Sequence, residues 1–250
     1  MSEPRGGAGR RRPVRRRRVS VIGVLGELLI SAGVFVLLFL GWQLWFNDLV
    51  VGGALRDEAT RQSSTWEGNA STAEPGTQDD PPVAAAPAAG EVLGLLIVPR
   101  WGSDYYLPIA EGTGTKQVLN KGQIGHYVTT AMPGAVGNFA IAAHRMAYGH
   151  PFSGLSDLRI GDHIFVETAD GWYQYEFRNL EYVRPTGVGV IAPVPQNDGV
   201  TPADRLITLT SCNPRYTAQE RIIAYGVYDA FYPRADGPPA EIAATIGATA

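Results

Sequence analysis

Short runs of β-branched and aromatic residues recur along residues 91–234, and Gly, Pro or Asp residues separate one run from the next. Runs of this length and composition are typical of β-strands. The pattern predicts strands at Val92–Pro99, Tyr105–Ala110, Asn138–His144, His163–Thr168, Trp172–Val183, Leu206–Ser211 and Ile222–Phe231. It also predicts single helical turns at Thr115–Leu119 and Ser153–Leu158. Many short strands without long helical patterns indicate a mainly all-β domain, an antiparallel barrel or sandwich.

A different pattern precedes this domain. Val21–Leu40 is a run of 20 mostly apolar residues, 14 of them Val, Ile, Leu or Phe, and it is long enough to cross a bilayer as a helix. Its one acid, Glu27, lies near the start of the run, where the side chain can extend toward the membrane surface. A cleavable signal peptide is the alternative, but its apolar region is about 7–15 residues long and a small-residue cleavage site follows it. We therefore expect an uncleaved transmembrane anchor over residues 21–45.

Charge is distributed unevenly about this run. Residues 1–18 hold eight arginines and one acid, whereas residues 46–250 hold 13 basic and 22 acidic residues. An arginine run can bind nucleic acid, but beside a membrane span it is typical of the cytoplasmic side. We therefore expect a basic cytoplasmic tail over residues 1–20, an extracellular remainder and no nucleic-acid partner.

The segments on either side of the domain lack a strand pattern. Residues 62–90 are rich in Ser, Thr, Pro, Ala and acids, a composition typical of disorder, and residues 47–61 are compatible with a short continuation of the membrane helix. We expect a flexible extracellular stalk over residues 46–90, a folded catalytic domain over 91–234 and a disordered C-terminal tail over 235–250.

Cys212 is the only cysteine of the chain. Outside the cell a lone thiol has no disulfide partner within its chain, so its presence there calls for another explanation. One explanation is burial as a small apolar side chain, and the other is catalysis as a nucleophile. One Cys and four scattered His residues show no metal-ligand spacing, and no phosphate-binding glycine loop follows a strand. We therefore expect no metal and no cofactor.

Two of the predicted strands end in residues that suit catalysis. Alternation gives each strand a bulky face that suits a core and a small, partly polar face. The bulky positions are Phe139, Ile141 and Ala143 in one strand and Ile207 and Leu209 in the other. The small faces include Ala140, Ala142, Thr208 and Thr210, and they end at His144 and Cys212. If the strands are neighbours, they form a shallow groove that an extended peptide fits, with an imidazole and a thiol at its end.

Arg221 follows Cys212 across a turn-rich segment. If the two flanking strands form a hairpin, the Cβ atoms of Cys212 and Arg221 lie roughly 5 Å apart. A guanidinium there can bind an oxyanion, and a neighbouring imidazole can transfer the proton. Taken alone, Arg221 also suits a solvated strand edge. The remaining histidines, His126, His150 and His163, are weaker candidates.

These residues resemble the motifs of the sortases, cysteine transpeptidases of the Gram-positive cell surface. The family's T-L-x-T-C signature is similar to Thr208–Cys212, and its arginine matches Arg221. The block Gly137–Arg145 (GNFAIAAHR) resembles the segment that carries the family's histidine, here His144. The Gly125–Tyr127 segment and the Asn-Pro after the cysteine look most like class E, the housekeeping sortases of high-GC bacteria. Ser211 departs from the signature's second threonine, and Ala143 stands where many relatives have glycine.

The resemblance implies a sortase-type barrel of eight β-strands with a few short helices, preceded by one transmembrane helix. It implies that Cys212, His144 and Arg221 are catalytic and that the enzyme cleaves an LPXTG-type or, in class E, LAXTG-type sorting motif between Thr and Gly. Tyr127 matches a tyrosine associated with the LAXTG preference, and we place it with Thr210 of the groove face among the substrate-binding residues.

The partners that the resemblance implies are surface proteins with a C-terminal sorting signal and a lipid-linked peptidoglycan precursor that supplies the amine. Three alternatives stay open at this point. They are a pilin-polymerising sortase, a cysteine hydrolase that transfers the acyl group to water, and a non-enzymatic module that binds extended peptides at its barrel edge.

Overall fold

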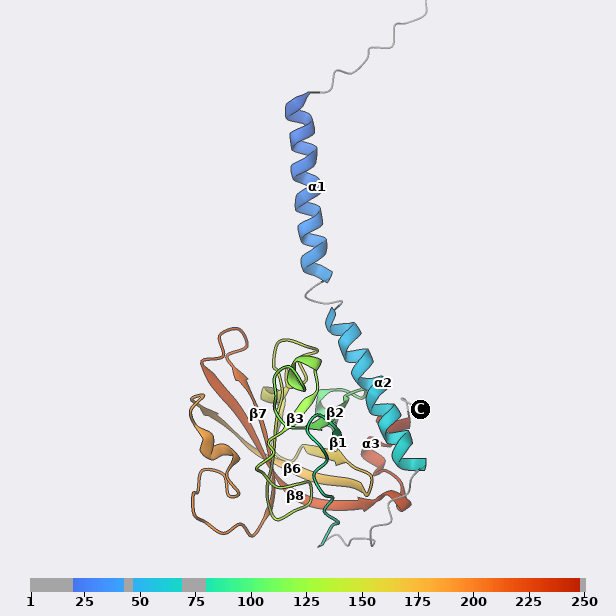
Figure 1. The fold of residues 1–250 in the computed structure, drawn as a ribbon, viewed down its shortest axis with the longest axis vertical. Helices are drawn as coiled ribbons and strands as arrows, with labels where there is room; N and C mark the ends of the chain where they lie inside the picture. Colours follow the sequence, from blue (N-terminus) through green and yellow to red (C-terminus); the bar gives the residue numbers. More distant parts are fainter. Residues whose placement is uncertain (1–19, 43–46, 69–79, 248–250) are drawn as a thin grey trace, which may run out of the picture. The chain divides into compact units, whose positions relative to one another are not determined.

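The computed structural model describes residues 20–42, 47–68 and 80–247, and the chain divides into two units, residues 1–44 and 45–250. The first unit contains helix α1 (Val21–Gly41), which by length and composition can cross a membrane and has no buried side chain (Figure 1). This helix fits the single-pass anchor predicted from the sequence. The predicted basic tail up to residue 19 and residues 43–46 of the predicted anchor lie outside the described residues.

The second unit is built on a closed β-barrel. Within the described residues, eight strands close in the order β1-β2-β3-β4-β7-β8-β6-β5. The strands are β1 (Val92–Ile97), β2 (Tyr106–Glu111), β3 (Ile124–His126), β4 (Gly137–Ala142), β5 (His163–Glu167), β6 (Gly171–Val183), β7 (Arg205–Asn213) and β8 (Glu220–Pro233). Most neighbours pair antiparallel, and β2–β3 and β4–β7 pair parallel.

This architecture confirms the predicted eight-stranded barrel. The seven runs found in the sequence correspond to seven of the eight strands of the described barrel, and the remaining strand is β3. β3 escapes a pattern-based prediction because it is three residues long, too short for an alternation to be seen. Single turns of 3-10 helix connect the strands, among them η3 (Leu119–Lys121), η4 (Leu155–Asp157) and η5 (Val188–Ile191).

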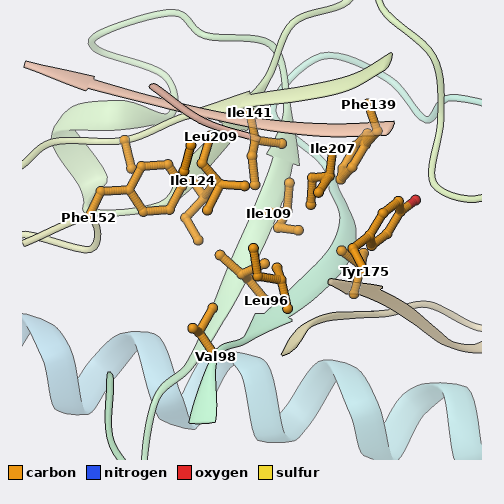
Figure 2. Packing of buried hydrophobic residues seen from close by; sticks show 14 of the residues in the cluster. Leu96, Val98, Ile109, Ile124, Phe139, Ile141, Phe152, Tyr175, Ile207 and Leu209 are labelled. Atoms are coloured by element: carbon orange, nitrogen blue, oxygen red, sulfur yellow. The ribbon is translucent and has the colours of Figure 1, made fainter. Parts of the chain in front are cut away.

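The barrel interior is filled by the bulky faces of the strands. Figure 2 shows Phe139, Ile141, Ile207 and Leu209 of β4 and β7 packed with Leu96, Ile109 and Ile124 of β1, β2 and β3. Each of these seven side chains is at most 1% exposed. Burial of a side chain of this size contributes about 1.5–3 kcal/mol relative to exposure, so this cluster fixes which face of β4 and β7 points inward. The opposite, small-residue faces of β4 and β7 therefore point away from the barrel interior.

Helix α2 (Asn47–Gly68, 22 residues) replaces about half of the predicted flexible stalk, residues 46–90. Leu55, Ala59 and Ser63, spaced one turn apart, are buried against the barrel, and α2 packs beside β2. The expectation of a flexible segment is therefore wrong for residues 47–68. The sequence pattern hides this helix because its buried face carries an alanine and a serine rather than a continuous apolar stripe.

The rest of the predicted stalk has no regular secondary structure where it is described. Residues 69–79 lie outside the described residues. In residues 80–90, the Pro82 carbonyl accepts a hydrogen bond from the Tyr173 hydroxyl (2.6 Å), and the Gly90 N–H donates to the Glu111 carbonyl (2.8 Å). This stretch is therefore tied to the barrel and not free of it.

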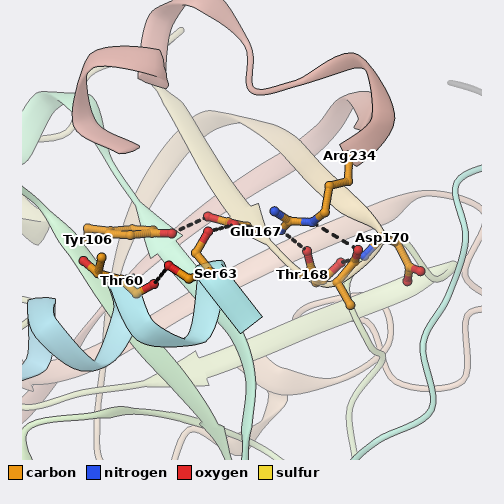
Figure 3. Close-up of polar contacts among 9 residues, drawn as sticks. Thr60, Ser63, Tyr106, Glu167, Thr168, Asp170 and Arg234 are labelled. Carbon is orange, nitrogen blue, oxygen red and sulfur yellow. Dashed lines mark hydrogen bonds and ion pairs between the residues drawn. The ribbon is translucent and has the colours of Figure 1, made fainter. Parts of the chain in front are cut away.

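A buried carboxylate joins α2 to the barrel (Figure 3). Glu167 of β5 is fully buried and accepts hydrogen bonds from Ser63 (2.6 Å), Tyr106 (2.6 Å) and Arg234 (2.7 Å). Burial, followed by the charge of Glu167, raises the pKa of the Tyr106 phenol, so its hydroxyl stays a donor. A buried charge needs such partners, and here they come from α2, β2 and the residue after β8.

The C-terminal segment also differs from the prediction. Residues Ala240–Gly247 form helix α3, in which Ile242 and Thr245 are buried. His163 Nδ1 lies 2.6 Å from the Glu241 carboxylate, which attaches α3 to the start of β5. The expected disordered tail is therefore wrong for residues 235–247, and residues 248–250 lie outside the described residues. The short EIAATI sequence contains two isoleucines four residues apart, a helical spacing that is easily missed at this length.

Candidate active site

The parallel pairing of β4 and β7 brings His144 and Cys212 to the same end of the barrel. Ala142 pairs with Thr210 in this register, and His144 and Cys212 each follow two residues later. Beyond the last pair, the Ser211 hydroxyl donates to the Ala143 carbonyl (2.7 Å) and the Ala143 N–H donates to the Thr210 carbonyl (3.3 Å). The strand adjacency assumed from the sequence is thus confirmed.

Cys212 and Arg221 lie directly opposite each other in the β7–β8 hairpin. The thiol is partly exposed, and so is the arginine. The guanidinium donates to the carbonyls of Ala218 (3.0 Å), in the turn that joins the two strands, and Glu220 (2.9 Å), the first residue of β8. Arg221 is therefore beside the thiol in the backbone register, with its side chain held on the turn.

Two contacts orient the His144 imidazole. Nε2 lies 3.0 Å from Oδ1 of Asn120, and the ring packs on Tyr148 with 5.1 Å between ring centroids. Since an amide oxygen only accepts hydrogen bonds, Nε2 carries a proton in this contact, and in the neutral ring Nδ1 keeps the lone pair. Burial lowers the pKa of His144, which favours that neutral form.

Asn120 was missed by the sequence reasoning. It lies in η3, far from His144 along the chain, and a single asparagine between Leu119 and Lys121 carries no periodic or motif signal. Only the fold brings η3 next to the histidine.

Arg145 links the segment after β4 to the β7–β8 turn. Its buried side chain donates to Oδ1 of Asn213 and to the Ser156 hydroxyl (3.1 Å). Asn213 in turn donates to the Glu220 carboxylate (3.1 Å). The residue after His144 is thereby tied to the residue after Cys212. The sequence placed Arg145 in the histidine block but gave it no role.

Tyr127 and Thr210, the two predicted substrate-binding residues, are in contact. Their hydroxyls lie 3.1 Å apart, and Thr210 also lies 3.3 Å from the Ile141 carbonyl. Thr210 is on the face of β7 that points away from the barrel interior, two residues before Cys212. The pair therefore flanks the thiol on the small-residue face.

The small-residue face is not open along its whole length. Asn138 donates to the carbonyls of Val190 (3.3 Å) and Ala192 (3.0 Å), and it accepts from Thr208 (2.7 Å). These bonds hold η5 over the start of β4 and β7. The shallow groove expected from the sequence is therefore covered at the end distant from Cys212.

His126, one of the weaker candidates from the sequence, lies in a strand. It ends β3 and is buried, with Nδ1 2.9 Å from the Glu111 carboxylate and Nε2 3.1 Å from the Ala131 carbonyl. These contacts fix the turn that carries Tyr127. Among the residues that the structure describes, no group of three or more His, Cys, Asp and Glu side chains is placed to hold a metal ion.

A partly exposed thiol, a neutral imidazole at the end of the neighbouring strand and a guanidinium opposite the thiol suit cysteine-dependent acyl transfer. Comparisons with known proteins identify the protein family. The sortase-domain profile matches residues 96–229, slightly more than half of the chain. Sortase SrtE2 of Streptomyces coelicolor is 36% identical over 227 residues, which cover 88% of this chain and 87% of the relative. Sortase SrtE1 of the same organism is 35% identical over 221 residues, which cover 86% of this chain but 59% of the relative.

Solved structures give the same result. The crystal structure of S. coelicolor sortase E1 with a tripeptide in the active site is 40% identical, with a TM-score of 0.57, and the match covers 64% of this chain and 99% of that one. The SrtA sortase of Actinomyces oris is 41% identical, with a TM-score of 0.62, over 65% of this chain and 93% of that one. The chain belongs to the sortases, a family of cysteine transpeptidases, and its relatives are consistent with class E.

Proposed function

We propose that this chain is a membrane-anchored sortase that cleaves an LAXTG-type or LPXTG-type sorting motif between Thr and Gly. It joins the threonine carbonyl of the cleaved protein to an amine of a peptidoglycan precursor. The observation that carries the proposal is the strand register: Cys212 pairs with Arg221 in the hairpin, and His144 ends the parallel neighbour of the cysteine strand. We assign the catalytic roles to these three residues.

In the first half-reaction the Cys212 thiol gives its proton to Nδ1 of His144, and the sulfur attacks the carbonyl carbon of the motif threonine. The Arg221 guanidinium exchanges its hydrogen bonds with the carbonyls of Ala218 and Glu220 for hydrogen bonds to the resulting oxyanion. Stabilisation of this kind usually contributes a few kcal/mol. The carbon–nitrogen bond then breaks, and the imidazolium proton moves to the departing glycine amine.

In the second half-reaction an amine attacks the thioester carbonyl. His144 takes a proton from that amine, the carbon–sulfur bond breaks, and the sulfur leaves as the Cys212 thiolate, which the imidazolium reprotonates. The products are a new amide bond and the starting enzyme. On this proposal one substrate is a surface protein that carries a sorting signal, and the other is a lipid-linked precursor that supplies the amine; both follow from membership of the sortase family.

We assign Tyr127 and Thr210 to binding of the sorting motif. Their contact beside Cys212 supports the assignment, because an extended peptide whose threonine carbonyl reaches the thiol passes over this face. The tripeptide in the active site of S. coelicolor sortase E1 is consistent with a peptide at such a position. The resemblance favours LAXTG over LPXTG.

We further propose that α1 anchors the enzyme with its N-terminus in the cytoplasm and its catalytic unit outside. The eight arginines before the span and the net negative charge after it support this orientation. Both substrates of the reaction are themselves membrane-bound, so an anchor raises the concentration at which they meet the enzyme.

The test is a peptide assay on the full chain in detergent, with a fluorescent LAXTG peptide and an added amine. We expect an amide product with the amine, no acyl-enzyme with Cys212→Ala, and turnover reduced by orders of magnitude with His144→Ala and Arg221→Ala. An intact thermal transition in each variant serves as the folding control. Normal turnover in Cys212→Ala would remove the nucleophile assignment.

The same assay separates the alternatives. Hydrolysis without amide product in the presence of the amine identifies a cysteine hydrolase. Strong preference for a lysine-containing pilin-type peptide over a stem-peptide amine identifies a pilin-polymerising enzyme. Absence of both products, together with peptide binding that survives alkylation of Cys212, identifies a binding module.

A further inference from the structure

Helix α2 touches both elements that hold the His144 imidazole. Gly122, which ends η3, and Gly149 both have a positive φ (+85° and +77°), and they lie against Val51 and Leu55 of α2. A Cβ placed on Gly122 would lie 2.8 Å from Leu55 Cδ1 and 3.1 Å from Val51 Cγ1. A Cβ placed on Gly149 would lie 3.2 Å from the same Val51 atom and 3.6 Å from the same Leu55 atom.

The two glycines lie next to the partners of His144. Asn120, which contacts Nε2, is two residues before Gly122, and Tyr148, whose ring packs on the imidazole, directly precedes Gly149. The turns also touch each other, since a Cβ on Gly122 would lie 2.6 Å from the Tyr148 carbonyl. Val51 and Leu55 thus lie behind the two turns whose side chains set the position of the histidine.

The rest of α2 is attached to the barrel independently of these contacts. Ser63 donates to the buried Glu167, Ala59 is fully buried, and Arg56 pairs with Asp104. Because of these attachments, a change at Leu55 leaves the helix in place and acts on the two turns. This separation makes a positioning role testable apart from the role of α2 in stability.

We propose that α2 positions the catalytic histidine, with Leu55 and Val51 as positioning residues that act through the turns of Asn120 and Tyr148. The proposal rests on the proposed role of His144. A helix that the sequence assigns to the connection between anchor and domain is, on this account, part of the catalytic machinery. A loss of packing behind the turns frees the imidazole from its alignment with the thiol and the scissile bond.

The test compares Leu55→Ala with Ile242→Ala in the full chain. Ile242 is a matched control, because it is also fully buried but packs in a second cluster, with Leu95, Ile97 and Phe165, that contains neither histidine turn. For Leu55→Ala we expect kcat to fall about ten- to a hundredfold with KM for the sorting peptide unchanged. The alkylation rate of Cys212 should fall as well, because the displaced imidazole no longer accepts the thiol proton. We expect Ile242→Ala to lower the melting temperature and leave kcat within about twofold.

A milder pair keeps the test decisive if Leu55→Ala does not fold. Leu55→Met retains most of the side-chain volume and restores kcat, whereas Val51→Ala removes two methyl groups and lowers kcat in the same direction. Equal kcat losses in Leu55→Ala and Ile242→Ala, or a wild-type kcat in Leu55→Ala and Val51→Ala, would overturn the proposal. A wild-type protein without transpeptidation would instead contradict the proposed function, so the two failures are distinguishable.

Discussion

In the proposed mechanism, the His144 side chain must meet two opposing requirements. To accept the thiol proton it must be neutral at rest, and to protonate the leaving amine it must hold that proton in the next step. Partial burial favours the neutral ring, because removal from water disfavours the imidazolium. Asn120 orients the ring through Nε2 without adding a charge that would reverse this preference.

A charge at position 120 should therefore move the pH dependence of the reaction. In the wild type, burial lowers the pKa of His144 below its ordinary value of 6.5, so the base form persists to a lower pH than in a free histidine. In Asn120→Asp the new carboxylate favours the imidazolium and raises this pKa. We expect the acidic limb of the kcat/KM profile to shift to higher pH in Asn120→Asp.

Asn120→Ala is the control for this shift. It removes the hydrogen bond without adding a charge, so we expect lower kcat with an acidic limb close to that of the wild type. The measurement is the pH profile of peptide transpeptidation by the three proteins. An acidic limb that is the same in Asn120→Asp and the wild type would show that this limb does not report the titration of His144.

At the scale of elements, the end of β4 is attached to β7 by a side-chain hydrogen bond in addition to the backbone bond from the Ala143 N–H to the Thr210 carbonyl. The regular pairing stops at Ala142 and Thr210, and the Ser211 hydroxyl continues it by donating to the Ala143 carbonyl. This bond fixes the backbone that leads into His144 relative to the backbone that leads into Cys212. The hydroxyl is also what Ser211 shares with the threonine of the family signature.

Removal of that hydroxyl should affect catalysis more than stability. In Ser211→Ala the Ala143 carbonyl loses its donor, which costs about 1 kcal/mol of unfolding free energy. We expect kcat to fall about tenfold, because only the Ala143 N–H bond to the Thr210 carbonyl then holds the histidine strand end to the cysteine strand. Ser211→Thr keeps the hydroxyl and should stay close to the wild type in both measurements. The measurements are a thermal melt and steady-state transpeptidation of the three proteins. If both variants kept full kcat, the role of the Ser211 hydroxyl would be purely structural.

The same elements show how far the sequence determines the site. Period-two alternation placed Phe139, Ile141, Ile207 and Leu209 in the core and brought His144 and Cys212 to one edge, because a strand has only two faces. The pairing of Arg221 with Cys212 followed from the short connection between two strands. Alternation is a local property, so it gave no access to contacts such as Asn120 with His144 that depend on how distant turns meet.

The direction of the Arg221 side chain could not be predicted from the sequence either. The register put Arg221 beside the thiol, but the guanidinium binds the carbonyls of Ala218 in the turn and of Glu220 at the start of β8. A long arginine side chain with several donors can bind any of the acceptors within its reach, and only the folded structure defines which acceptors are near. The orientation of the arginine therefore had to come from the structure.

At the scale of the whole molecule, α2 changes where the catalytic unit begins. The folded domain predicted from the strand pattern starts at residue 91, and the family match starts at residue 96. In the structure the unit already includes Leu55, Ala59 and Ser63, and five residues, 42–46, separate α1 from α2 in the sequence. About half of the long flexible connection expected after the anchor is thus a packed helix.

A chain that starts after α2 should consequently have a lower free energy of unfolding. In residues 80–250 the buried Glu167 keeps Tyr106 and Arg234 but loses the Ser63 donor, a bond to a charged group that contributes about 1.5–3 kcal/mol. Loss of Leu55 and Ala59 also exposes the apolar barrel surface that they cover, at about 25 cal/mol per Å². We expect the denaturant midpoint of residues 80–250 to lie well below that of residues 47–250.

The denaturant midpoint of Ser63→Ala in the longer chain should fall between the two, because this substitution removes the hydrogen bond and keeps the apolar contact. Equal midpoints for the two chain lengths would mean that α2 rests on the barrel without stabilising it, and the domain boundary predicted from the sequence would then be the better one.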